Sequence, residues 1–151
     1  MSRAQLHLTV AAIVCYQQRF LLVEETDKLS DRRVLNQPAG HVEQDEDLLS
    51  AVQRELYEET GLLLTPSSWL GISQLKASNS HRYVRVNFVF EPTSLPGHYQ
   101  PQDSDILALH WLSADQLQQS ALPLRSALVS DAIQLYQQGV RLPLNLIQPA
   151  R

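Results

Sequence analysis

Residues 40–62 read GHVEQDEDLLSAVQRELYEETGL, and this stretch decides how the rest of the chain is interpreted. Seven of the sixteen Asp and Glu residues lie between Glu43 and Glu59. The acids before residue 48 are typical of a helix start, and Gly61 is typical of a helix end. The apolar residues between them follow helical spacing, which predicts a helix over 47–60.

A helical wheel at 100° per residue places the acids of this helix against its apolar stripe, which is formed by Leu48, Leu49, Val52 and Leu56. Glu59 falls about 20° from Leu48, inside the stripe, and Glu55 falls at its edge. Glu58 is their neighbour on the helix surface. Burying unpaired carboxylates is costly, and the nearby Arg54 cannot neutralise all three. Hard oxygen ligands in this arrangement suit Mg²⁺ or Mn²⁺.

The spacing within 40–62 also matches the pattern G-x5-E-x7-R-E-U-x-E-E-x-G-U, in which U is a bulky aliphatic residue. The constrained positions are Gly40, Glu46, Arg54, Glu55, Leu56, Glu58, Glu59, Gly61 and Leu62. From average residue usage, a chance match has a probability on the order of 10⁻⁸. The sequence therefore resembles the Nudix hydrolases, which cleave a nucleoside diphosphate linked to another group.

This resemblance implies an α/β (α+β) fold, an α/β/α sandwich with a mixed sheet and a loop–helix–loop metal site, in one domain over 1–151. It implies metal ligands at Glu55, Glu58, Glu59 and the main-chain carbonyl of Ala39, with Mg²⁺ as cofactor and Mn²⁺ as its substitute. Glu46 and Arg54 would form a salt bridge that fixes the loop against the helix. For the general base that activates water, two candidates stay open, Glu58 and Asp105.

Outside this stretch, strands and helices alternate without a strict βαβ repeat, which indicates a mixed sheet covered by helices. Strands are expected at 6–16, 20–24, 35–38, 70–75, 83–90 and 106–112, a helix start at 113–116 and a helix at 126–138. Residues 25–33 are predicted to form an exposed charged loop. In 83–90, Val84, Val86, Phe88 and Phe90 share one face, and Tyr83, Arg85 and Asn87 share the other.

The substrate contacts are predicted from polar residues near the metal loop. Arg85 and Tyr83 lie on the polar face of one strand, where a cation could hold a distal phosphate. Arg82 and His81 are alternatives at the start of that strand. Gln37, His41 and Asp103 are further candidate contacts. Tyr16, Trp69 and Trp111 could stack on a base, but core packing is the expected role of these rings.

Segments across the chain, among them 36–41, 103–106 and 136–144, resemble a bacterial phosphatase branch of the Nudix hydrolases. This implies release of orthophosphate from nucleoside tri- and diphosphates, from thiamine pyrophosphate or from hydroxymethylpyrimidine pyrophosphate. One alternative is a pyrophosphohydrolase of ADP-ribose, dinucleoside polyphosphates or RNA 5′ ends. Others are a ligand sensor without turnover and an isomerase, although the isomerase needs a pocket cysteine and the single Cys15 lies in a core-like strand.

Composition narrows the classes of partner and cellular location that the sequence predicts. The chain has 151 residues, a net charge of −4 and one cysteine. The charge argues against a protein that grips a nucleic-acid backbone, so the expected partner is a small nucleotide or pyrophosphate. One cysteine excludes an internal disulfide framework, and no apolar run approaches the ~20 residues of a membrane-spanning helix. We therefore expect a cytoplasmic protein with no membrane partner; its length makes a monomer feasible and leaves a dimer open.

Overall fold

The computed structural model of the chain describes Arg3 and residues 5–151. Its strands are β1 (Leu6–Tyr16), β2 (Arg19–Asp27), β3 (Arg32–Asn36), β4 (Ala39–His41), β5 (Ser68–Lys76), β6 (Arg82–Phe90) and β7 (Ile106–Leu112). Its helices are α1 (Leu48–Thr60), α2 (Ala114–Gln118), α3 (Ala127–Gln137) and the 3₁₀ turn η1 (Leu144–Leu146). Within the described residues, no helix has the length and apolar character needed to cross a membrane.

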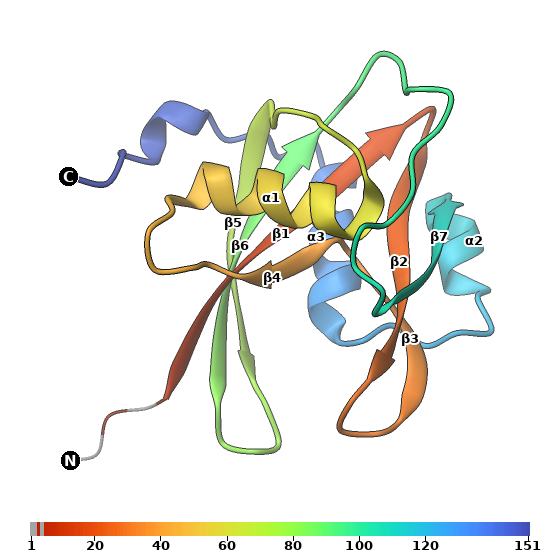
Figure 1. The fold of residues 1–151 in the computed structure, drawn as a ribbon, viewed down its shortest axis with the longest axis horizontal. Coiled ribbons are helices and arrows are strands. Elements are labelled where there is room, and N and C mark those ends of the chain that lie inside the picture. Colours follow the sequence, from red (N-terminus) through yellow and green to blue (C-terminus); the bar gives the residue numbers. More distant parts are fainter. Residues whose placement is uncertain (1–2, 4) are drawn as a thin grey trace.

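The seven strands form a mixed sheet. Five of them follow the order β3-β2-β1-β6-β5, while β4 pairs with β1 and β7 pairs with β2. β1 and β6 are parallel from Leu6↔Arg82 to Val14↔Phe90, and the other strand pairs are antiparallel. The short strand β4 therefore lies beside the long central strand β1. The chain then continues from β4 through a loop into α1, which holds the predicted metal ligands Glu55, Glu58 and Glu59 (Figure 1).

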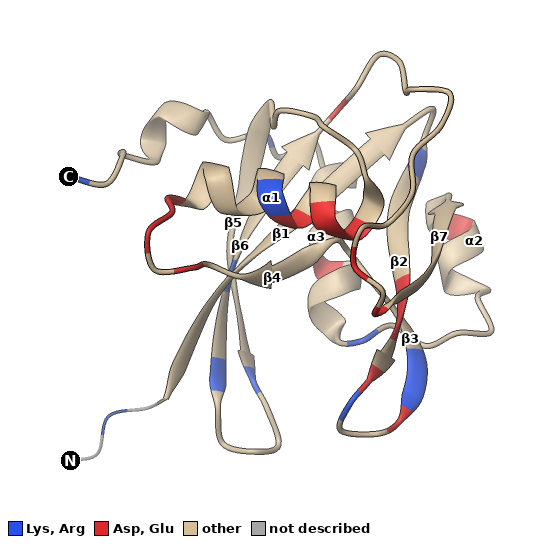
Figure 2. Cartoon of the chain, in the orientation of Figure 1, with Lys and Arg blue, Asp and Glu red and all other residues tan. Residues whose placement is uncertain are grey.

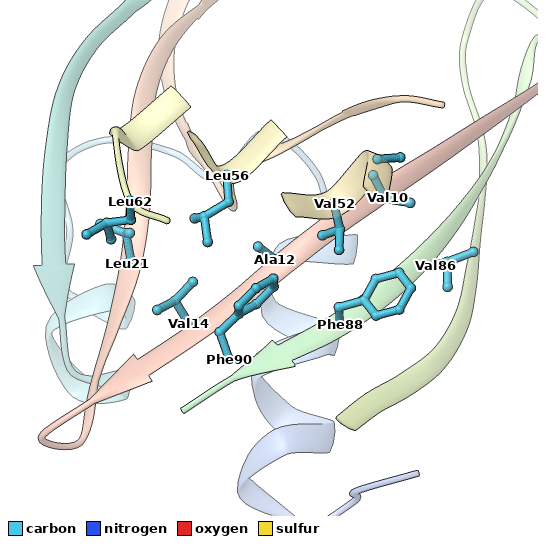
Figure 3. Packing of buried hydrophobic residues seen from close by; sticks show 11 residues of the cluster. Val10, Ala12, Val14, Leu21, Val52, Leu56, Leu62, Val86, Phe88 and Phe90 are labelled. Carbon is cyan, nitrogen blue, oxygen red and sulfur yellow. The ribbon is translucent and has the colours of Figure 1, made fainter. Parts of the chain in front are cut away.

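Helices cover both faces of the sheet because the central strand β1 is apolar on both faces. On one face, Val10, Val86 and Phe88 pack with Val52 and Leu56 of α1 (Figure 3). On the other face, Ala11, Ile13 and Val89 pack with Val129, Ala132 and Ile133 of α3. Such near-continuous apolar strands suit a sheet that is buried on both sides. The α/β/α arrangement and the two faces predicted for β6 are confirmed.

The prediction of a loop over 25–33 is wrong. β2 continues to Asp27 and β3 begins at Arg32, so only residues 28–31 turn the chain. Asp27 stabilises this turn, because its carboxylate accepts from Leu29 N at 3.1 Å and from Ser30 Oγ at 3.1 Å. Charged side chains mask the strand pattern here, since the pairing with β3 is made by backbone groups. The short strand β4 and the turn η1 were not predicted either.

Gly61 ends α1 in a conformation that an L-residue tolerates poorly. Its φ is 81°, and a Cβ there would collide with the main chain of Gln100. Gly139 has a similar φ of 87°, but a Cβ there would meet nothing within 4 Å. A substitution at either glycine would therefore force an L-residue into left-handed backbone. Of the two, only a substitution at Gly61 would also cause a steric collision.

We expect Gly61→Ala to lower the free energy of unfolding by about 2 kcal/mol or more, and Gly139→Ala by about 1 kcal/mol. Urea denaturation of both variants and the wild type measures the two losses. Equal losses would show that Gln100 moves aside at no cost.

Candidate active site

Helix α1 presents three carboxylates toward the sheet and the loop that precedes it. The Asp47 side chain caps the helix by accepting from Ser50 N at 2.8 Å, which fixes the start of the helical register. That register leaves Glu55 and Glu59 buried, at 9% and 7% exposure, and the Glu58 side chain at 44%. Figure 2 shows acidic residues along α1 and its preceding loop, with one basic residue among them.

The basic residue is Arg54, which joins the loop to the helix. It donates to Glu46 through Nε at 2.9 Å and through Nη2 at 2.6 Å. Nη2 also donates to the main-chain oxygen of His41 at 3.0 Å, and Nη1 donates to Glu55 at 2.9 Å and to Glu58 at 3.2 Å. The hydrogen bonds from Arg54 lower the pKa of Glu46, so this loop acid stays ionised.

Glu59 has a different environment, because no cation contacts it among the described residues. Its Oε1 accepts from the main-chain N–H of Ala39 at 2.9 Å. Burial is the largest influence on its pKa and raises it, and the charges of Glu25, Glu55 and Asp103 act in the same direction. Against the opposing hydrogen bond from Ala39, the pKa reaches about 9. Burial also raises the pKa of Glu55. A carboxylate held this way gains from any cation placed beside it.

Gly40 lies directly against the Glu55 carboxylate. A Cβ at this position would overlap the Glu55 carboxyl group. The absence of a side chain at residue 40 therefore lets β4 approach α1, and it holds the Glu55 oxygens beside the backbone of 39–40. A glycine is required here by close approach, and no unusual backbone angle is involved.

These residues fit a divalent cation by donor chemistry. Three carboxylates on successive turns of α1 and the backbone of Ala39 offer only oxygen ligands, which Mg²⁺ and Mn²⁺ prefer. In the described part of the chain, no three Asp, Glu, His or Cys side chains converge on one point, since Arg54 Nη1 lies between Glu55 and Glu58. Coordination by all three therefore requires the carboxylates to exchange Arg54 contacts for metal contacts.

A cavity of about 340 Å³ opens beside these acids and is lined by Ala39, Gly40 and residues from β1, β2, β3, β5, β6 and the start of α3. Three of the predicted substrate contacts, Tyr83, Arg85 and His41, line it. Tyr83 stacks on His7 with ring centroids 4.6 Å apart, and His7 also hydrogen bonds to His41 and His81. The predicted phosphate-binding strand thus lines the cavity directly, and the acidic helix lies behind its wall, where Glu59 and Glu55 contact Ala39 and Gly40.

Other candidates do not face this cavity. Gln37 is 1% exposed, and its side chain donates to Val129 O and accepts from Arg85, so it supports Arg85 from below the cavity wall. Arg82 is exposed at the start of β6 and does not line the cavity. Trp69 and Trp111 pack against the core on the α1 side, as expected.

The two acids near the end of α1 have separate environments. Asp103 lies close to the acidic face, because its N–H donates to Glu58 O at 2.9 Å and its charge raises the pKa of Glu59. Asp105 is exposed, and its N–H donates to Asp103 Oδ1 at 2.9 Å. Of the two acids, Asp103 is therefore the one placed beside the carboxylates of α1.

Several polar residues that line the cavity are not among the predicted contacts, and three of them, Glu25, Asn36 and Arg125, form one connected group of side chains. Glu25 was assigned to the loop over 25–33, although it lies in β2. Arg125 reaches the cavity because 124–125 pairs with β3, through Leu35 N to Pro123 O and Arg125 N to Leu35 O. No local pattern marks this contact between distant segments.

Comparisons with known proteins agree with this geometry. The NUDIX domain family matches residues 5–133. Phosphatase NudJ of Escherichia coli strain K12 is 41% identical over 141 residues, which is 93% of this chain and 90% of that protein. The NUDIX hydrolase from Nitrosomonas europaea superposes with a TM-score of 0.87 at 33% identity, covering 97% of this chain and 98% of that one.

A third comparison extends the likeness of the fold alone. The NUDIX domain of Shewanella oneidensis NrtR, solved as a cocrystal with ADP ribose, has a TM-score of 0.67 at 24% identity, over 91% of this chain and 88% of that one. Together with the sheet and helix arrangement, these likenesses confirm the fold predicted from residues 40–62.

We expect Gly40→Ala to weaken binding of Mg²⁺ or Mn²⁺ by about tenfold or more, because the new methyl group displaces the Glu55 carboxylate. The fold should change little, since the displaced atoms are the end of a flexible side chain. Titration calorimetry with Mn²⁺ measures the affinity. Gly97→Ala is the matched control, because a Cβ at Gly97 meets nothing within 4 Å. Unchanged affinity in Gly40→Ala would exclude Glu55 as a ligand.

We expect Glu59→Gln to raise the free energy of unfolding of the metal-free protein by about 1–2 kcal/mol at neutral pH. The amide can still accept from Ala39 N–H, and it carries no charge into the buried site. The same variant should lose most of the stabilisation that Mg²⁺ gives the wild type. Urea denaturation with EDTA and with Mg²⁺ measures both effects.

Asp45→Asn is the control for this prediction, since Asp45 is an exposed acid of the same loop. A Glu59→Gln protein that gains as much from Mg²⁺ as the wild type would contradict a ligand role for Glu59.

Proposed function

The chain belongs to the Nudix hydrolase family, and we propose that it is a Mg²⁺-dependent phosphatase that releases orthophosphate. The proposed substrates are nucleoside tri- and diphosphates and thiamine pyrophosphate or hydroxymethylpyrimidine pyrophosphate, with Mn²⁺ able to replace Mg²⁺. One observation carries the proposal: the buried carboxylates Glu55 and Glu59 lie against the backbone of 39–40, and this backbone lines the cavity that also holds the buried guanidinium of Arg85. The 41% identity to Phosphatase NudJ supports the specificity.

The charges at the cavity suit a pyrophosphate ester. We propose Glu55, Glu58, Glu59 and the Ala39 carbonyl as metal ligands. A bound divalent cation neutralises phosphate oxygens and lowers the pKa of a coordinated water. The Arg85 guanidinium offers a planar, permanently charged donor set for a phosphate group. Arg54, held by Glu46, keeps the loop and α1 in register, so that the carboxylates stay on the cavity side.

Glu58 is the proposed general base. Its side chain is more exposed than those of Glu55 and Glu59, and Arg54 at 3.2 Å orients its Oε2. An accessible carboxylate can accept the proton of the attacking water and pass it to solvent, which a buried one does less readily. Asp105 remains the alternative from the sequence, and Asp103 is the acid that lies nearer to α1.

Product analysis tests the proposal. Purified protein with Mg²⁺ is offered thiamine pyrophosphate, a nucleoside triphosphate, a nucleoside diphosphate and ADP-ribose, and chromatography identifies the products. We expect orthophosphate from the first three. Glu58→Gln should lower kcat by about 100-fold or more, because the water loses its proton acceptor. Asp45→Asn, which removes an exposed acid of the loop before α1, should keep near wild-type turnover.

The other outcomes separate the alternatives. AMP released from ADP-ribose would keep the hydrolase and overturn the specificity. Release of pyrophosphate in place of orthophosphate would show that water attacks a different phosphorus atom of the substrate. No turnover of any substrate by the wild type would favour a ligand sensor.

A further inference from the structure

The guanidinium of Arg85 is a buried cation without a carboxylate partner. Arg85 is 7% exposed in the middle of β6, and Nη2 donates to Asn36 Oδ1 and to Gln37 Oε1, each at 3.0 Å. Both acceptors are neutral amides. Nε is buried and has no hydrogen-bond partner, and among the described residues no carboxylate lies within ion-pair distance of Arg85. A cation buried in this way is stabilised by an anion that the fold does not supply.

A carboxylate does lie close by, and Arg125 holds it. Glu25 Oε1 accepts from Arg125 Nη1 at 2.7 Å and from Asn36 Nδ2 at 3.1 Å. The Glu25 side chain is 14% exposed and that of Arg125 is 43% exposed. Burial lowers the pKa of Arg85 to about 10. The charge of Glu25 raises this pKa, and the charge of Arg125 lowers it. The three charged groups therefore interact, although only two of them touch.

Asn36 separates the two oppositely charged groups. Its Nδ2 donates to Glu25, and its Oδ1 accepts from Arg85. The side chains form a chain of contacts in which Arg125 binds Glu25, Glu25 binds Asn36 and Asn36 binds Arg85. The direction of the amide follows from its neighbours, since a carboxylate can only accept and a guanidinium can only donate. Glu25, Asn36, Arg85 and Arg125 all line the same cavity.

We propose that Arg125 is a positioning residue that neutralises Glu25 and so keeps Arg85 available for a phosphate group of the substrate. This inference rests on the proposed function, because it assigns the anion that Arg85 receives. Arg125 acts through Glu25 and makes no substrate contact of its own.

The physical reason is competition between two anions for one guanidinium. The Glu25 carboxylate is largely buried, so it would be poorly solvated without its cation and would be stabilised by pairing with the nearest donor. Once Arg125 is removed, that donor is Arg85, whose planar group suits bidentate binding of a carboxylate as well as of a phosphate. The substrate must then displace Glu25 before it binds. With Arg125 present, the carboxylate is already satisfied and Arg85 is free.

Rescue by a second substitution tests the inference. Arg125→Gln leaves Glu25 unpaired, and we expect it to weaken binding of inorganic pyrophosphate to the metal-free protein by about tenfold. The double variant Glu25→Gln/Arg125→Gln has no carboxylate to compete, so binding should return to within about threefold of the wild type. Titration calorimetry measures both affinities, and Arg85→Gln gives the level of binding without the guanidinium.

Turnover supplies a second readout. With Mg²⁺ and thiamine pyrophosphate, Arg125→Gln should raise KM by about tenfold and change kcat by less than about twofold, and the double variant should lower KM again. Arg33→Gln is the matched control. It removes an arginine from an ion pair with Glu24 at 3.4 Å on the same hairpin, and neither of these residues lines the cavity.

Three results would overturn the inference. If the double variant binds as weakly as Arg125→Gln, Arg125 contacts the anion itself. If Arg125→Gln binds as well as the wild type, the pair with Glu25 only stabilises the fold. If the wild type binds pyrophosphate no better than Arg85→Gln, Arg85 is not an anion site. Failure of the proposed function is distinct from these results, because it appears as absence of wild-type turnover. The pyrophosphate titrations of the metal-free variants still test the role of Arg125 in that case.

Discussion

The contacts of Arg54 are the constraint on which the site depends. One guanidinium bonds to the loop acid Glu46, to the main chain at His41 and to two acids of α1. Without this cation, Glu46 and the acids of α1 would repel one another across a short distance. The loop between β4 and α1 would then lose the hydrogen bonds that hold it against the helix. The backbone of 39–40, which contacts Glu55 and Glu59, is held by its pairing with β1, and Arg54 holds the next residue, His41, through its main-chain oxygen.

The same helix has to satisfy two opposing demands. Its apolar stripe anchors α1 on the sheet through Val52 and Leu56, and Glu55 and Glu59 share the buried side of that helix. Burial raises the pKa of both carboxyl groups, so the metal-free fold is less stable than it would be with neutral side chains there. This is the usual relation between a binding site and stability, in which groups arranged for a ligand destabilise the protein without it.

The sequence predicted what depends on local spacing. The register of α1 and the two faces of β6 follow from residues that lie close together in the chain, and the pairing of Glu46 with Arg54 follows from the family resemblance. Gln37 shows the limit of such reasoning. It was chosen because it flanks the metal loop, but its amide binds Val129 of α3 and supports Arg85. Arg125 was not found because its place depends on a bridge between 124 and β3, which is a contact between distant segments.

The buried acid Glu59 and the buried base Arg85 lie near the same cavity wall without forming an ion pair. Glu59 and Arg85 would pair if they touched, and each would then be closed to a ligand. Glu59 is instead held by the N–H of Ala39, and Arg85 is held by the amide oxygens of Asn36 and Gln37. Neutral backbone and amide groups thus hold the two side chains apart. In the proposed function, a pyrophosphate ester carries several negative oxygens, so one molecule would contact the guanidinium and, through a divalent cation, the carboxylates. The separation of Glu59 and Arg85 leaves each side chain open to its proposed ligand.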